Sequence, residues 1–135
     1  MIPGVWIGRK LNDTEATEAV RQGVAAVLDV TAEFNEARPF LNVEYLNLQI
    51  LDLTSPTQEQ MKQMAGFINE HSSKGIVYVH CKIGYSRSAA AVGAYLLAQA
   101  EAVNVQEVIH KLRSARPSII VRPEIFDALS RFNHF

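Results

Sequence analysis

The apolar residues fall into four short runs, separated by polar segments, that predict β-strands. Residues 76–80 (Ile-Val-Tyr-Val-His) are rich in β-branched and aromatic side chains, which suit a pleated surface, so this run predicts a central strand. Residues 24–30 form a second apolar run, bounded by a glycine and a polar stretch, that predicts a buried strand. Residues 5–8 and 43–48 predict two further strands, and the polar residues 31–39 predict a loop.

Apolar residues that recur at intervals of three and four predict helices between and after these strands. The first helix is expected to start at Asp13 and to end at Gly23, because an aspartate can cap a helix and a glycine commonly follows one. In the second helix Ser55 is the predicted cap, Gln58 completes a capping box, and Gly75 marks the far end.

The remaining helices complete the predicted fold class. Residues 88–100 are apolar on all sides, which predicts a helix buried in the middle of the domain. Asn104 with Glu107 predicts a capping box for a fourth helix, and Pro123 predicts the first turn of a last one. Strands that alternate with helices indicate an α/β fold with a central, mostly parallel sheet flanked by helices. Because ligands of such sheets bind beyond the carboxyl ends of the strands, the loop after His80 is the candidate site.

Composition and charge narrow the class of protein. The chain has 135 residues, which at about 150 residues per domain predicts a single domain over residues 1–135. Its formal net charge of −1 predicts no binding of nucleic acid. The longest charge-free apolar stretch, 88–100, is shorter than the ~18 residues of a membrane span, and no signal peptide is recognisable. We therefore expect a cytoplasmic protein, or a domain excised from a larger membrane-associated one.

The chemistry of the candidate loop begins with a cysteine and ends with an arginine. Cys81, the one cysteine of the chain, directly follows the central strand, and Arg87 stands where the buried helix begins. The five residues between them can wrap so that their backbone N–H groups face an anion, and Gly84 permits the backbone conformations that such a loop needs. The planar fork of Arg87 suits two phosphate oxygens. The loop therefore predicts a phosphate site.

The same positive field is expected to act on the thiol. Helix N-termini and a nearby arginine can lower a cysteine pKa from ~8.5 to roughly 3.5–7.5, which would make Cys81 a ready nucleophile. Ser88 is expected to donate a hydrogen bond to the sulfur and to ease its departure, and His80 to order the loop. The alternative interpretations are a small buried hydrophobic residue for Cys81, and plain helix caps for Ser86 and Ser88.

Residues 80–88 (His-Cys-Lys-Ile-Gly-Tyr-Ser-Arg-Ser) resemble the HCxxGxxRS signature of the cysteine-dependent protein tyrosine phosphatase superfamily, in its dual-specificity branch. The resemblance implies hydrolysis of a phosphomonoester through a cysteinyl-phosphate, without a metal ion. It implies catalytic roles for Cys81, Arg87 and Ser88, and an aspartate upstream as general acid and then base. Asp52, 29 residues before Cys81, is the predicted acid, and Asp29 is the alternative. The implied phosphate cradle consists of Lys82, Ile83, Gly84, Tyr85, Ser86 and Arg87.

A narrower likeness concerns the substrate. Several segments, among them 77–82, 86–89 and 111–114, resemble the mitochondrial phosphatidylglycerophosphate phosphatase type. That type carries a second basic residue in the signature loop, where this chain has Tyr85, so Lys82 stands alone and Arg122 is the candidate for added charge beside the pocket. The resemblance thus implies either a lipid phosphate or a phosphotyrosine, phosphoserine or phosphothreonine protein as substrate. A catalytically silent phosphate-binding module is the rival, and the sequence predicts no oligomeric state.

Overall fold

The computed structural model describes residues 2–31, 40, 43–50, 54–81 and 86–132. Strands and helices alternate along the chain, in the pattern expected of an α/β protein. The elements in chain order are β1 (Val5–Arg9), α1 (Asp13–Arg21), β2 (Val24–Asp29), β3 (Glu44–Asn47), α2 (Gln58–Ser72), β4 (Ile76–Cys81), α3 (Ser86–Ala98), α4 (Val105–Ala115) and α5 (Pro123–Ser130).

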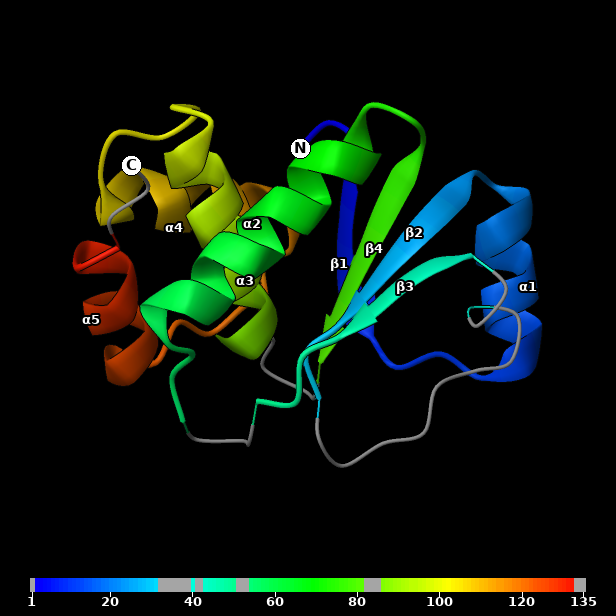
Figure 1. Cartoon of the computed structure of the whole chain (residues 1–135), viewed down its shortest axis with the longest axis horizontal. Coiled ribbons are helices and arrows are strands. Elements are labelled where there is room, and N and C mark those ends of the chain that lie inside the picture. Colours follow the sequence, from blue (N-terminus) through cyan, green and yellow to red (C-terminus); the bar gives the residue numbers. More distant parts are fainter. Residues whose placement is uncertain (1, 32–39, 41–42, 51–53, 82–85, 133–135) are drawn as a thin grey trace.

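The four strands form one sheet in the order β1-β4-β2-β3, and every described pairing is parallel (Figure 1). Parallel neighbours need crossover connections, and in the described residues α1 and α2 belong to such connections. β4 lies in the interior of the sheet, between β1 and β2, as its β-branched sequence predicts. The carboxyl ends of all four strands therefore meet at one edge, and the predicted fold class is confirmed.

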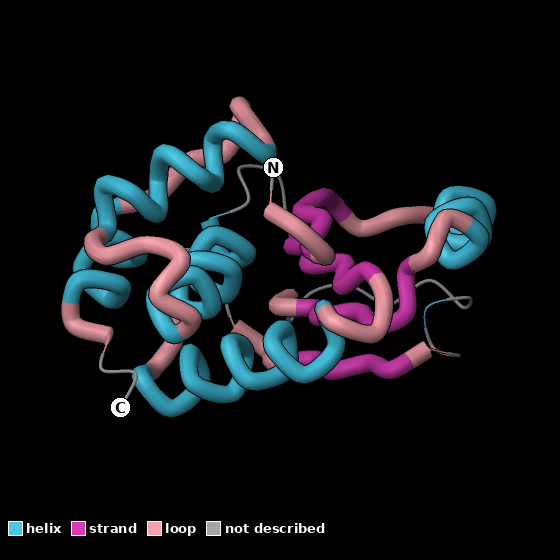
Figure 2. Tube along the Cα trace, turned by 90° about the horizontal axis from the view of Figure 1, so that it is seen from above, coloured by secondary structure: helices cyan, strands magenta, loops and turns pink. Residues whose placement is uncertain are grey.

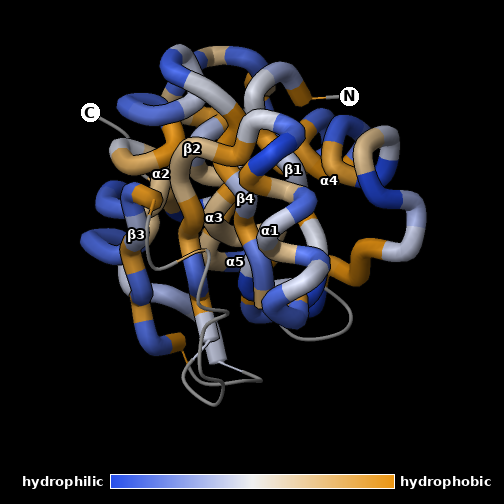
Figure 3. The backbone as a smooth tube through the Cα atoms, turned by 90° about the vertical axis from the view of Figure 1, so that its right-hand side faces the viewer, coloured by the Kyte–Doolittle hydropathy of each residue, from blue (hydrophilic) through white to orange (hydrophobic). Residues whose placement is uncertain are grey.

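Helices cover the sheet unequally. Helix α1 lies on one face, while α2, α3, α4 and α5 gather on the other (Figures 1 and 2). The larger core fills the space between the sheet and these four helices, and a smaller cluster with Phe40 and Tyr78 lies under α1. Helix α3 is buried along most of its length, which fits its apolar colouring in Figure 3 and the predicted central position. None of the helices in the described residues is both long and apolar enough to cross a bilayer.

Two predicted helix starts are wrong by one or two residues. The N-cap of α1 is Asn12, whose side chain accepts the Glu15 N–H at 2.8 Å while the Glu15 carboxylate accepts the Asn12 N–H at 3.1 Å. The N-cap of α2 is Thr57, in a reciprocal capping box with Gln60, and not Ser55 with Gln58. In both cases several polar residues in a row could cap, and only reciprocal backbone geometry selects among them.

Helix α3 also differs in its limits, because it begins at Ser86 and ends at Ala98, two residues earlier at each end than predicted. Its end is set by a turn in which Ala100 adopts a φ of 57° and the Glu101 N–H donates to the Leu96 carbonyl at 2.9 Å. This pattern satisfies a helix-terminal carbonyl with a left-handed residue that is not glycine, which sequence alone does not signal. The early start brings Ser86, Arg87 and Ser88 into the first turn.

A close contact between β1 and β4 depends on a glycine. The Tyr78 hydroxyl on β4 donates to the Arg9 carbonyl at 2.6 Å and passes directly over Gly8. A Cβ atom at position 8 would overlap that hydroxyl and its ring. The contact joins the end of β1 to β4, the strand that leads into the candidate loop.

We expect Gly8→Ala to lower the free energy of unfolding by about 1–3 kcal/mol, because the added methyl overpacks a buried contact and displaces the Tyr78 hydrogen bond. The matched control is Gly66→Ala in α2, where a Cβ meets no atom within 4 Å. That variant should gain roughly 0.5–1 kcal/mol from helix propensity. Urea unfolding of both variants checks this, and a neutral Gly8→Ala would contradict the contact.

Candidate active site

Cys81 is the last residue of β4 and lies at the carboxyl edge of the sheet. In register it pairs with Arg9 of β1, and its thiol belongs to the core on the face covered by α2 to α5. The residue is 1% exposed. Because side chains alternate along a strand, the neighbouring His80 points to the opposite face, beneath α1. The predicted strand ends at His80, and the structure extends it by one residue, so that Cys81 itself closes β4.

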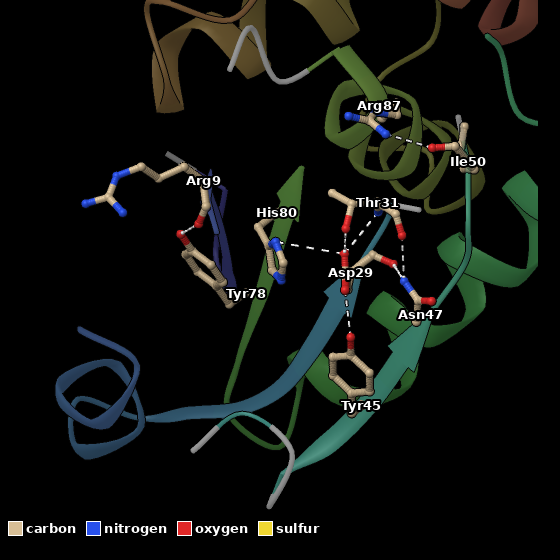
Figure 4. Close-up of polar contacts among 9 residues, drawn as sticks. All are labelled: Arg9, Asp29, Thr31, Tyr45, Asn47, Ile50, Tyr78, His80 and Arg87. Atoms are coloured by element: carbon tan, nitrogen blue, oxygen red, sulfur yellow. Dashed lines mark hydrogen bonds and ion pairs between the residues drawn. The ribbon is translucent and has the colours of Figure 1, made fainter. Parts of the chain in front are cut away.

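Arg87 lies in the first turn of α3 and is 3% exposed. Its Nη1 donates to the backbone carbonyl of Ile50 at 2.7 Å (Figure 4). A buried guanidinium requires hydrogen-bond acceptors, and Ile50 supplies one from the segment that follows β3. This contact joins the start of α3 to the chain only two residues before Asp52.

Several predicted site residues lie outside the described part of the chain. They are the general-acid candidate Asp52 and the loop residues Lys82, Ile83, Gly84 and Tyr85. Within the described residues, no three His, Cys, Asp or Glu side chains gather closely enough to hold a metal ion. The structure therefore describes the two ends of the candidate loop, which are the end of β4 and the first turn of α3.

The surroundings of the thiol act in opposite directions. Burial raises the pKa of Cys81 above its ordinary value, while the neighbouring Ser88 hydroxyl and backbone, together with the charge and backbone of Arg87, lower it. Among the described residues burial outweighs these contributions, so the predicted lowering of the thiol pKa is not confirmed. The physical reason is desolvation, which penalises the charged form of a group that is almost completely enclosed. The N–H groups of residues 82–85 belong to the part not described.

The two serines that flank Arg87 have different partners. Ser88 is completely buried and acts on the Cys81 thiol. The Ser86 hydroxyl accepts the backbone N–H of Arg122 at 3.2 Å and so joins the starts of α3 and α5. Both serines lie within the first turn of α3.

The backbone of Arg122 contacts the first turn of α3, because its N–H donates to the Ser86 hydroxyl. It is the N-cap residue of α5, and its Nε donates to the Glu124 carboxylate at 2.6 Å. The hydrogen bond from Arg122 keeps the pKa of Glu124 below its usual value. The structure therefore brings the backbone of Arg122 next to the first turn of α3 and pairs its guanidinium with an acidic neighbour.

A polar cluster on the opposite face of the sheet was not predicted. Asp29, at the end of β2, is 1% exposed and pairs in register with His80 (Figure 4). Its Oδ1 accepts the Thr31 N–H at 2.9 Å and the Thr31 hydroxyl at 2.6 Å, and its Oδ2 accepts the Tyr45 hydroxyl at 2.6 Å. The sequence offers one signal of this cluster, which is an aspartate at the end of an otherwise apolar strand.

This position argues against Asp29 as the general acid. Its side chain lies on the face beneath α1, whereas the Cys81 thiol lies on the face covered by α2 to α5. Both carboxylate oxygens already accept hydrogen bonds. Asp52 thus stays the predicted acid, on the sequence argument alone.

We expect Ser88→Ala to raise the pKa of Cys81, because it removes the hydroxyl that stabilises the thiolate. The matched control is Ser86→Ala, which removes a hydroxyl bonded to Arg122 and should leave the thiol pKa unchanged. Ultraviolet absorbance of the thiolate, followed against pH with Cys81→Ser as the blank, measures both. Equal shifts in the two variants would contradict the assignment of the two serines.

With this geometry in place, comparison with known proteins identifies relatives. The human protein named phosphatidylglycerophosphatase and protein-tyrosine phosphatase 1 is 38% identical over 95 residues, which are 69% of this chain and 47% of that protein. A protein phosphatase Slingshot homolog of Xenopus laevis is 34% identical over 103 residues, 75% of this chain and 15% of the relative. The chain spans about half the length of the curated relatives of the first kind.

Solved structures agree with the sequence comparison. The crystal structure of PTPMT1 in complex with PI(5)P has a TM-score of 0.86 at 26% identity, covering 97% of this chain and 90% of the other. The active form of Tk-PTP has a TM-score of 0.82 at 25% identity, covering 98% and 97%. Residues 5–135 match the family described as dual specificity phosphatase, catalytic domain. The chain therefore belongs to the dual-specificity phosphatase catalytic-domain family.

Proposed function

We propose that the chain hydrolyses phosphomonoesters with Cys81 as nucleophile. The observation that carries the proposal is the junction of β4 and α3, where a buried thiol at a strand end faces Arg87 and Ser88 in the first turn of a helix. Such a junction offers a phosphate both a guanidinium and helix N–H groups. Membership of the dual-specificity phosphatase family supports the same chemistry.

The proposed reaction has two steps and uses no metal ion. The Cys81 thiolate attacks phosphorus, the P–O bond to the leaving group breaks, and Asp52 gives its proton to the leaving oxygen. In the second step the Asp52 carboxylate takes a proton from water, the water oxygen attacks the cysteinyl-phosphate, and phosphate and thiolate are released. Arg87 and the N–H groups of residues 82–87 stabilise the charge on the phosphoryl oxygens, and Ser88 donates to the departing sulfur.

Two substrate classes follow from the relatives. We propose a phospholipid monoester first, because relatives at 37–38% identity carry the name phosphatidylglycerophosphatase and because a fold neighbour was crystallised with PI(5)P. A phosphorylated protein is the second candidate, supported by the other half of that name and by the Slingshot relative. The substrate must then be selected outside the phosphate cradle, since the cradle chemistry is common to both.

The remaining proposals concern the extent and location of the domain. We propose that residues 1–135 act as a single catalytic domain, which the family match over residues 5–135 supports. The compartment is proposed to be the cytoplasm, or a membrane surface if the domain belongs to a longer chain. No metal, cofactor or nucleic acid has a part in the proposed reaction.

We expect Cys81→Ser to abolish phosphate release, because a serine hydroxyl is a far weaker nucleophile at neutral pH. Wild type and variant are compared on phosphatidylglycerophosphate in detergent, a phosphotyrosine peptide and a small aryl phosphate. Preference for the lipid supports the first substrate class, and preference for the peptide the second. Release by Cys81→Ser above a few per cent of wild type would contradict the nucleophile, and no release by wild type would favour a silent phosphate-binding module.

We expect Asp52→Ala to slow hydrolysis by about 10²–10⁴-fold for a substrate with a poor leaving group, because such a group needs a proton as it departs. An aryl phosphate with a good leaving group should lose much less. The kcat values on the two substrates check this. Asp29→Ala is not a suitable control, so Asp127→Ala, at an exposed position within α5, serves as one. Equal losses on both substrates would show that Asp52 is not the acid.

A further inference from the structure

A buried contact between an aspartate and a histidine lies directly behind the proposed nucleophile. Asp29 and His80 occupy paired positions on neighbouring strands, on the same face of the sheet. The His80 Nδ1 and Asp29 Oδ1 atoms are 4.0 Å apart, and both residues are at most 1% exposed (Figure 4). His80 directly precedes Cys81, so the direction of its ring and the direction of the thiol are set by adjacent residues of one strand.

The carboxylate of Asp29 is fixed from two sides. The Thr31 backbone and hydroxyl hold Oδ1 from the segment after β2, and the Tyr45 hydroxyl holds Oδ2 from β3. Three hydrogen bonds on two oxygens leave the carboxylate little freedom to rotate. It therefore presents a fixed negative charge to the ring of His80.

Hydrogen bonds to backbone carbonyls also connect the ends of these strands. The Asn47 side-chain amide donates to the carbonyls of Asp29 at 3.0 Å and of Thr31 at 2.9 Å. The Val30 N–H donates to the His80 carbonyl at 3.2 Å. The ends of β2, β3 and β4 are thus joined into one hydrogen-bonded unit at the edge where the phosphate is proposed to bind.

Among the groups that surround His80, the Asp29 carboxylate is the one that faces its ring from β2. On β4 the Tyr78 ring lies 5.8 Å from the His80 ring, and the Tyr78 hydroxyl is held by the Arg9 carbonyl. On β2 the facing group is the Asp29 carboxylate, while Cys81 and Arg87 belong to the other face of the sheet. Burying a carboxylate costs free energy that an apolar residue would not, unless its hydrogen bonds compensate. A role in orienting His80 accounts for a buried carboxylate at this point.

We propose that Asp29 is a positioning residue that, fixed by Thr31 and Tyr45, orients His80 and through it the Cys81 thiol. The proposal rests on Cys81 as the nucleophile of the proposed function. Asp29 acts as a support behind the reacting groups, comparable to the outer partners that orient metal-bound histidines, whose loss commonly costs about 10–100-fold.

The first test is Asp29→Asn, which keeps the size and an acceptor oxygen but removes the charge. We expect kcat/KM on an aryl phosphate to fall about 10- to 100-fold, and the acid limb of its pH profile to move to higher pH. Removing the negative charge of Asp29 would by itself lower the pKa of Cys81, so a thiolate absorbance that titrates at higher pH in the same variant reports the loss of orientation. The matched control is Glu44→Gln, which removes an exposed carboxylate from the start of β3 and should change neither.

A second variant guards against loss of folding. Tyr45→Phe removes one donor to Oδ2 and leaves the carboxylate in place, so it should shift both readouts in the same direction by less. Lower thermal stability with unshifted pH profile and thiolate titration in both variants would overturn the proposal and leave Asp29 a structural residue. If wild type releases no phosphate, the proposed function fails, and the thiolate titration alone still decides the role of Asp29.

Discussion

The pairing of β4 with β1 and β2 in fixed register is the constraint on which the site depends. It brings the end of β4 to the carboxyl edge of a parallel sheet, where the chain must leave one layer and enter the helix layer. Strand alternation then separates two adjacent residues, Cys81 toward the large core and His80 toward α1. A one-residue slip in register would exchange these faces, and both the thiol and the imidazole would lose their partners.

Burial gives the site its electrostatic character. Cys81, Arg87 and Ser88 are all at most 3% exposed, so interactions among them are weakly screened by water. The same burial raises the pKa of the thiol, so formation of the thiolate depends on the neighbouring groups of Ser88 and Arg87 that stabilise it. A phosphate that enters such a site exchanges water for donors already in place, which is the usual source of rate enhancement in charge-developing reactions.

The sequence predicts the coarse fold and the ends of the site well. Residues 76–80 signal a central strand by composition, and the apolar stretch before residue 100 signals a buried helix, because both depend on local pattern. The caps Asn12 and Thr57 were missed since neighbouring polar residues compete, and only the folded backbone selects one.

Contacts between distant segments are beyond what a single sequence can predict. The hydrogen bond from Arg87 to the Ile50 carbonyl and the bond from Tyr45 to Asp29 join residues 37 and 16 positions apart. No periodicity encodes such pairs, because they follow from strand order and register. The direction of the thiol pKa was missed for the same reason, as enclosure by α3 and the sheet is a tertiary property.

The central claim is that phosphate passes through Cys81, and the most direct measurement is to trap the intermediate. Wild-type protein is mixed with a phosphorylated substrate, quenched during turnover with a denaturant at alkaline pH, digested at alkaline pH and analysed by mass spectrometry. The account predicts one phosphoryl group on the peptide that contains Cys81. Phosphate release without any covalent adduct, or an adduct on a different residue, would contradict it.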